Sequence, residues 1–145
     1  MTDYTQAEAD LLLAMEKHRL DDTLYQIPAN GVSEAIPLAS PDGRESFTLD
    51  VWRQAIVLSK VRYQNRARKT LILARIDLGG APHTNPDGSE ITCPHLHLYH
   101  EGYGTRWAFP LPDIFTNTAD LWHTLDEFMV FCHITEPPNI ARSLW

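Results

Sequence analysis

The chain is poor in cysteine, lacks long apolar runs and has few basic residues outside one segment. Only Cys93 and Cys132 occur among 145 residues, too few for a disulfide-stapled secreted scaffold. We therefore expect reduced thiols, a cytoplasmic location and no cysteine-based zinc site. No apolar stretch approaches the ~18 residues that a membrane helix needs. The residues Met1–Tyr4 lack a basic segment followed by an apolar one, which argues against a secretory signal. We expect no membrane partner.

The remaining composition is that of an ordinary globular protein, with 43% hydrophobic and 21% charged residues. The length suits one hydrophobic core, and we find no repeat, low-complexity tract or linker. We therefore predict a single domain over residues 1–145. A net charge of −7 argues against a general nucleic-acid binder.

The basic residues are gathered in one segment. Between Arg53 and Arg75 there are seven basic residues and no acidic one, whereas the rest of the chain holds five basic and nineteen acidic residues. A strand over residues 59–68 would point every second side chain to one face, about 6.6 Å apart, close to the phosphate spacing of a nucleic-acid strand. We call these residues the basic row: Lys60, Arg62, Gln64, Arg66 and Arg68. The row predicts a site for nucleic acid or another anionic ligand. The alternative is a solvated face whose charges pair with acids elsewhere.

The pattern of apolar residues predicts an α+β fold, a single antiparallel sheet of about five strands with an N-terminal and a C-terminal helix packed on it. A helix over residues 5–20 would begin at the capping box formed by Thr5 and Glu8. A second helix is expected over residues 118–133. Strands are expected at 35–39, 46–51, 59–68, 70–78, 95–99 and 106–109, with a hairpin turn near 68–70.

Histidines mark a second candidate site. His95 and His97 are two apart on a predicted strand, so both rings project from one face. His83 lies in the preceding loop, 82–88. With Glu101 or His83 as third ligand, His95 and His97 could hold a divalent metal such as zinc. Without a metal, the three histidines could act as general acid and base.

Arg75 and Asp77 would share one face of the apolar strand 70–78. Buried charges are costly unless they are paired, so a structural ion pair is one interpretation. In the other, Arg75 or Lys60 stabilises negative charge that develops on a phosphate. Gly79-Gly80 is not a phosphate-binding P-loop, because no Gly-Lys-Ser/Thr follows it.

These residues also form an extended motif. It reads Arg75-x-Asp77-Leu78-x-Gly80-x-Pro82-His83-x-Asn85-Pro86-Asp87-Gly88, then Pro94-His95-x-His97-x-Tyr99-x-Glu101-Gly102-Tyr103-Gly104 and Trp107-Ala108. The motif resembles that of a small uncharacterised family of bacterial and prophage proteins, and the resemblance covers most of the chain after about Glu45. It implies a mobile-element or defence-related setting and transfers no catalytic role.

Three functional hypotheses follow. The first is a nucleic-acid-directed protein, such as a toxin-like endoribonuclease that needs no cofactor. The basic row would hold phosphates, and His83, His95, His97 and Arg75 would act in catalysis, since the RNA 2′-hydroxyl supplies the nucleophile. The second is a metal-binding domain built on His95 and His97. The third is a non-enzymatic, phage-related inhibitor with a protein partner, whose acidic surface mimics nucleic acid.

Overall fold

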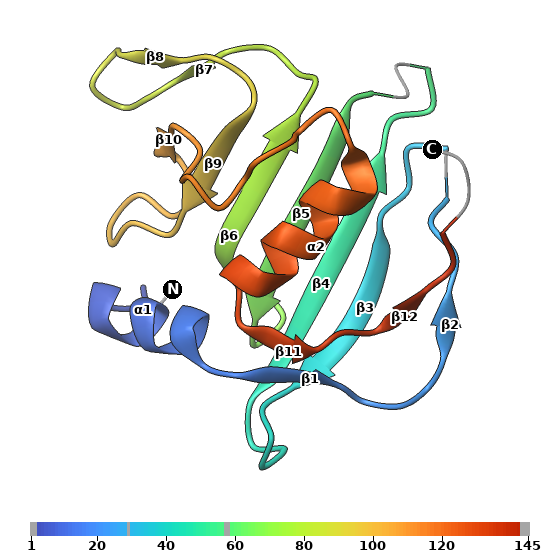
Figure 1. The fold of residues 1–145 in the computed structure, drawn as a ribbon. Helices are drawn as coiled ribbons and strands as arrows, with labels where there is room; N and C mark the ends of the chain where they lie inside the picture. Colours follow the sequence, from blue (N-terminus) through green and yellow to red (C-terminus); the bar gives the residue numbers. More distant parts are fainter. Residues whose placement is uncertain (1–2, 29, 57–58, 143–145) are drawn as a thin grey trace.

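The computed structural model describes residues 3–28, 30–56 and 59–142. Within these residues an eight-stranded sheet in the order β10-β9-β6-β5-β4-β3-β1-β11 carries two helices, and two smaller sheets pair β12 with β2 and β7 with β8 (Figure 1). The elements are α1 (Gln6–Ala14), β1 (Lys17–Arg19), β2 (Leu24–Tyr25), β3 (Glu34–Ala39), β4 (Ser46–Arg53), β5 (Val61–Ala67), β6 (Leu71–Leu78), β7 (His83–Thr84), β8 (Glu90–Ile91), β9 (His95–Leu98), β10 (Ala108–Phe109), α2 (Leu121–Phe131), β11 (Ile134–Glu136) and β12 (Asn139–Ile140).

The centre of the sheet follows the alternation in the sequence. Buried and half-buried residues alternate strictly along β5, and β5 pairs antiparallel with β6 through the expected hairpin. Arg68 and Lys69 form its turn with φ of 51° and 70°. The loop has three residues, since Ala67 pairs with Leu71, and left-handed backbone at its first two residues reverses the chain direction over this short distance.

One face of the sheet is the hydrophobic core, and α2 lies over it (Figure 1). Tyr63 of β5 is fully buried there, with its ring 6.2 Å from that of Phe128. Its hydroxyl donates a 2.7 Å hydrogen bond to the carbonyl of Leu121. Because side chains alternate along a strand, the neighbours of Tyr63 on β5, Arg62 and Gln64, project from the opposite face. We call that opposite side the polar face.

The predicted sheet of about five antiparallel strands is wrong. The sheet is larger and mixed, because β1 pairs antiparallel with β3 but parallel with β11. The added strands β1 and β11 have three residues each, too few to show an alternating pattern. The N-terminal helix is also shorter than expected and ends at Ala14, although the capping box of Thr5 and Glu8 is confirmed.

Lys17 explains why the chain leaves α1 so abruptly. Its side chain is completely buried, and its ammonium donates to the carbonyls of Leu13, Met15 and Cys132 at 2.9, 2.8 and 2.7 Å. The carbonyls at a helix C-terminus lack partners within the helix. One lysine of β1 therefore satisfies the C-terminal ends of both α1 and α2 and joins them to the sheet.

Within the described ranges, neither helix has the length and apolar character that crossing a membrane requires.

Candidate metal centre

The neighbouring strands β6 and β9 bring four polar side chains together on the polar face. In the antiparallel register His95 is opposite Asp77, and His97 is opposite Arg75. Directly opposite residues of paired strands point to the same side of a sheet. The same register on the other side of β6 places Arg62 of β5 opposite Asp77. The basic row and the histidines therefore share one face of the sheet. Alternation within each strand could not establish this, because it does not relate one strand to another.

Two imidazoles converge on one carboxylate oxygen. The Nε2 atoms of His95 and His97 lie 3.3 and 3.5 Å from Oδ2 of Asp77. One ligand atom from each of the three residues lies within 4.8 Å of the others. The histidines are 2% and 1% exposed, so water screens this cluster poorly.

Backbone carbonyls orient both rings. Nδ1 of His97 is 2.7 Å from the carbonyl oxygen of Thr105, and Nδ1 of His95 is 3.3 Å from that of Thr92. A carbonyl only accepts, so Nδ1 carries a proton in each ring, and Nε2 is the nitrogen that faces Asp77. In the neutral form of the rings the two Nε2 lone pairs face the carboxylate, and a proton or a metal ion between them removes the repulsion that results. Nε2 of His97 is buried and lacks a hydrogen-bond partner among the described atoms.

The pKa shifts of His95 and Asp77 both favour the forms of these groups that bind metals. Burial lowers the pKa of His95, and the charge of Asp77 offsets this only in part. The neutral ring that results is the form that binds metals. For Asp77, burial would raise the pKa, but a hydrogen bond from His97 when Nε2 is protonated, together with the charge and hydrogen bonds of the Arg75 guanidinium, outweighs burial and holds the pKa well below its usual range. Asp77 is therefore ionised at neutral pH.

Arg75 serves Asp77. Its Nε and Nη2 donate to the two carboxylate oxygens of Asp77 at 2.9 and 3.1 Å, two residues along the same strand. Arg62 approaches from β5, with Nε 3.6 Å from Oδ1. The carboxylate is thus clamped in position by cations on one side and presents Oδ2 to the histidines on the other. The structure therefore contains the ion pair between Arg75 and Asp77 that was one interpretation of the sequence.

His83 covers the cluster without entering the ligand triad. It lies on β7, and its ring centroid is 4.7 Å from that of His97 and 5.9 Å from that of His95. Its Nε2 is 2.7 Å from the carbonyl oxygen of Arg106, so this nitrogen carries the proton. The short sheet of β7 and β8 therefore positions the imidazole of His83 at the edge of the site.

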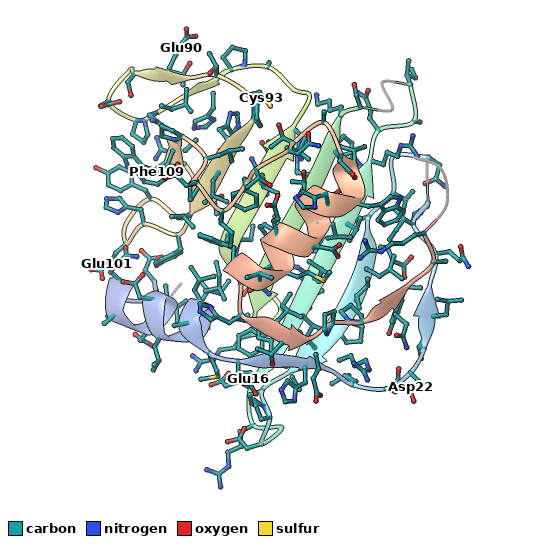
Figure 2. The ribbon with its side chains drawn as sticks, in the orientation of Figure 1. Glu16, Asp22, Glu90, Cys93, Glu101 and Phe109 are labelled. Atoms are coloured by element: carbon teal, nitrogen blue, oxygen red, sulfur yellow. The ribbon has the colours of Figure 1, made fainter. Side chains whose placement is uncertain are left out.

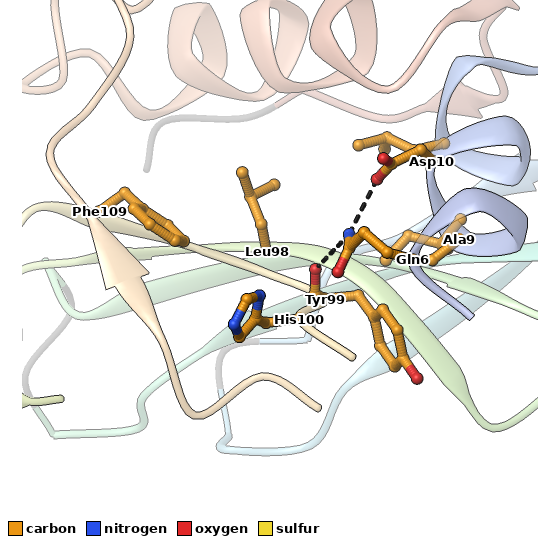
Figure 3. A pocket seen from close by; sticks show the side chains of 9 residues that line it. Gln6, Ala9, Asp10, Leu98, Tyr99, His100 and Phe109 are labelled. Atoms are coloured by element: carbon orange, nitrogen blue, oxygen red, sulfur yellow. Dashed lines mark hydrogen bonds between the residues drawn. The ribbon is translucent and has the colours of Figure 1, made fainter. Parts of the chain in front are cut away.

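Glu101 lies elsewhere. Its carboxylate accepts a 2.6 Å hydrogen bond from the backbone N–H of Gln6, the first residue of α1. Gln6 in turn donates to the carbonyl of Tyr99 and to Asp10, beside a pocket of about 180 Å³ (Figure 3). In Figure 2, Glu101 is beside α1, away from Cys93, which lies near the histidine end of β9. Among the described residues, the group whose geometry could hold a metal ion is Asp77, His95 and His97, whereas the sequence suggested Glu101 or His83 as the third member.

The basic row is largely paired with acids. Arg66 binds Asp50 through Nε and Nη2 at 2.6 and 2.9 Å, and Gln64 donates to the same carboxylate. Arg68 lies in the hairpin turn, outside β5, and binds Glu45. The positions that remain, Lys60 and Arg62, line one cleft together with Asp77, and Nε of Arg62 is 3.6 Å from Oδ1 of Asp77.

A family model, described as a family of unknown function (DUF6978), matches residues 4–134. The chain belongs to the DUF6978 family. This confirms the resemblance to an uncharacterised family, and the matched residues include α1, the whole histidine cluster and α2. No curated protein and no solved structure matches the chain.

Asp77 is the site residue that sequence reasoning left out. A signal was present, because Asp77 is an acid in an otherwise apolar strand and shares its face with Arg75. Its partnership with the histidines depends on the pairing of β6 with β9, which no local pattern contains.

Proposed function

We propose that this DUF6978 protein binds a divalent transition-metal ion through Asp77, His95 and His97. The observation that carries the proposal is the convergence of two imidazole Nε2 atoms on one oxygen of an ionised carboxylate. Two histidines and one carboxylate are the protein ligands of many catalytic zinc sites and of non-haem iron(II) sites. Both metals leave further coordination positions open for water or substrate.

The spacing of the ligand atoms supports the proposal. With bonds of about 2.0–2.1 Å, neighbouring ligands of a tetrahedral ion are ~3.4 Å apart. The distances of 3.3 and 3.5 Å from Oδ2 to the two nitrogens agree with this value, and the three ligand atoms all lie within 4.8 Å of one another. An ion here would also relieve the repulsion between the lone pairs and the carboxylate.

The surroundings of the ligands support it as well. Metal-binding histidines usually donate their other ring N–H to a carbonyl or carboxylate, which holds the ring in the correct tautomer. Thr92 and Thr105 supply such carbonyls to His95 and His97. Arg75 likewise holds the carboxylate of Asp77.

Burial favours metal binding over direct proton transfer to RNA. A general acid or base must come within hydrogen-bond reach of the substrate. His95 and His97 are 2% and 1% exposed and are covered by His83, so a polynucleotide has no direct access to their nitrogens. A buried ion needs no such access, since it meets small ligands through its open positions.

Elemental analysis of untagged protein tests the proposal. Metal-depleted protein dialysed against Zn²⁺, Fe²⁺ or Mn²⁺ should retain one ion per chain of at least one metal. His97→Ala and Asp77→Asn should lose this ion. His123→Ala is the matched control, because His123 is an exposed histidine of α2 whose contacts are with Glu127 and Thr116. Failure of the wild type to retain any of these metals, or equal retention by His97→Ala, would overturn the proposal.

A further inference from the structure

A small cleft opens beside Asp77 on the polar face. It has a volume of about 170 Å³. Its lining residues come from the start of β5 and the end of β6: Lys60, Val61, Arg62, Asp77, Leu78, Gly80 and Ala81. A water molecule takes up ~30 Å³ of liquid volume, so the cleft has room for several water molecules or for one phosphate or carboxylate group.

Two cations of the cleft are available to a ligand. For Lys60, no ion pair or side-chain hydrogen bond is found among residues 3–28, 30–56 and 59–142. The guanidinium of Arg62 stacks 4.9 Å from the ring centroid of Trp52, and only Nε approaches Asp77, at 3.6 Å. Stacking on an aromatic ring holds a guanidinium in place and leaves its edge free for hydrogen bonds.

The local charge is positive although the protein is acidic. Arg75 and Arg62 both contact the carboxylate of Asp77, and Lys60 adds a third positive charge, so the single carboxylate leaves an excess of positive charge around the cleft. A divalent ion on Asp77 would add two further positive charges. In a chain with net charge −7, this is a concentrated positive field at a concave site, and such fields attract anions.

We infer that this cleft binds a small-molecule oxyanion, a carboxylate or a phosphate, held by Lys60 and Arg62 next to the metal position. The inference rests on the proposed metal site only in placing the oxyanion next to a metal ion. Binding of the oxyanion by Lys60 and Arg62 does not require that ion. A neighbouring cleft of about 320 Å³ shares Arg62 and is lined by Trp52, Asp50 and Gln64. It offers hydrogen-bonding groups to the body of a ligand whose charged end occupies the first cleft.

The test titrates metal-depleted and Co²⁺-loaded protein with inorganic phosphate and, separately, with acetate at constant ionic strength. Amide NMR shifts report binding by the metal-depleted form. We expect saturable shifts of residues 60–62 and 79–81 with at least one anion, and the choice of anion identifies the class. Lys60→Gln and Arg62→Gln should each weaken binding at least about tenfold, the effect of one charge-assisted hydrogen bond.

Controls separate this inference from the metal proposal. Arg44→Gln removes the same charge from the turn between β3 and β4, at the far end of the sheet in Figure 1, and should bind as wild type. Lys60→Arg should retain binding. With Co²⁺ bound, the anion should change the visible spectrum, and His97→Ala should lose only this response. If neither anion shifts the residues 60–62 and 79–81, or if Lys60→Gln and Arg62→Gln bind as wild type, the inference is wrong, whatever the metal content.

Discussion

Replacing Asp77 by Asn distinguishes a metal ligand from a structural counter-ion. Asparagine keeps the shape of the side chain and removes its charge. The carboxylate of Asp77 accepts hydrogen bonds of 2.9 and 3.1 Å from Arg75 and faces the imidazoles at 3.3 and 3.5 Å. Its side chain is 16% exposed, so solvent weakens these interactions only in part. A metal ligand and a structural counter-ion therefore both predict that Asp77→Asn loses stability. Only a metal ligand predicts that the loss is larger when metal is present.

The magnitude follows from the two contributions. Breaking a buried ion pair costs about 3–5 kcal/mol, and partial exposure reduces this to about 2–3 kcal/mol for metal-free Asp77→Asn. A metal at 100 times its dissociation constant stabilises the wild type by about 2.7 kcal/mol more. The difference in free energy of unfolding should therefore grow to about 5 kcal/mol when metal is present. Urea unfolding followed by tryptophan fluorescence measures it, once with chelator and once with Zn²⁺.

Asp50→Asn is the matched control for this experiment. Asp50 lies on the same polar face and makes an equivalent two-bond contact with Arg66. Its replacement should cost a similar amount with chelator and the same amount with Zn²⁺. If Asp77→Asn also showed no dependence on metal, Asp77 would serve only as the partner of Arg75, and the reasoning from convergent lone pairs would be refuted.

Three further predictions concern the scaffold. Lys17→Met should lower the free energy of unfolding by about 3–5 kcal/mol in urea titrations, because three buried carbonyls lose their charged donor. Burial raises the pKa of Tyr63, so above pH 10, the pKa of an unperturbed tyrosine, only the unfolded state loses the phenol proton. Tyr63 should then add about 1.4 kcal/mol per pH unit to the fall in stability, and Tyr63→Phe should remove that part of the slope. Gly79→Ala should destabilise more than Gly43→Ala in thermal melts. Both glycines have positive φ, but only at Gly79 would the new Cβ meet the backbone oxygen of Ser59, at 2.3 Å.

Local pattern was sufficient for the centre of the fold. Alternation along residues 59–68 and 70–78 predicted the β5–β6 hairpin, which is confirmed, and the N-terminal capping box is confirmed as well. The short strands β1 and β11 escaped prediction because strands of three residues contain no measurable period. Their existence depends on partners more than 100 positions away, as the pairing of Lys17 with Ile134 shows.

By itself, the sequence determined which side chains share a face of their own strand, His95 with His97 and Arg75 with Asp77, because the period of a strand is two residues. Only the tertiary structure decided which faces meet. The register between β6 and β9 placed Asp77 beside both histidines. Glu101 instead accepts a hydrogen bond from the first residue of α1. Register is a non-local property, set by the packing of the whole sheet, so strand alternation could indicate a site but could not complete it.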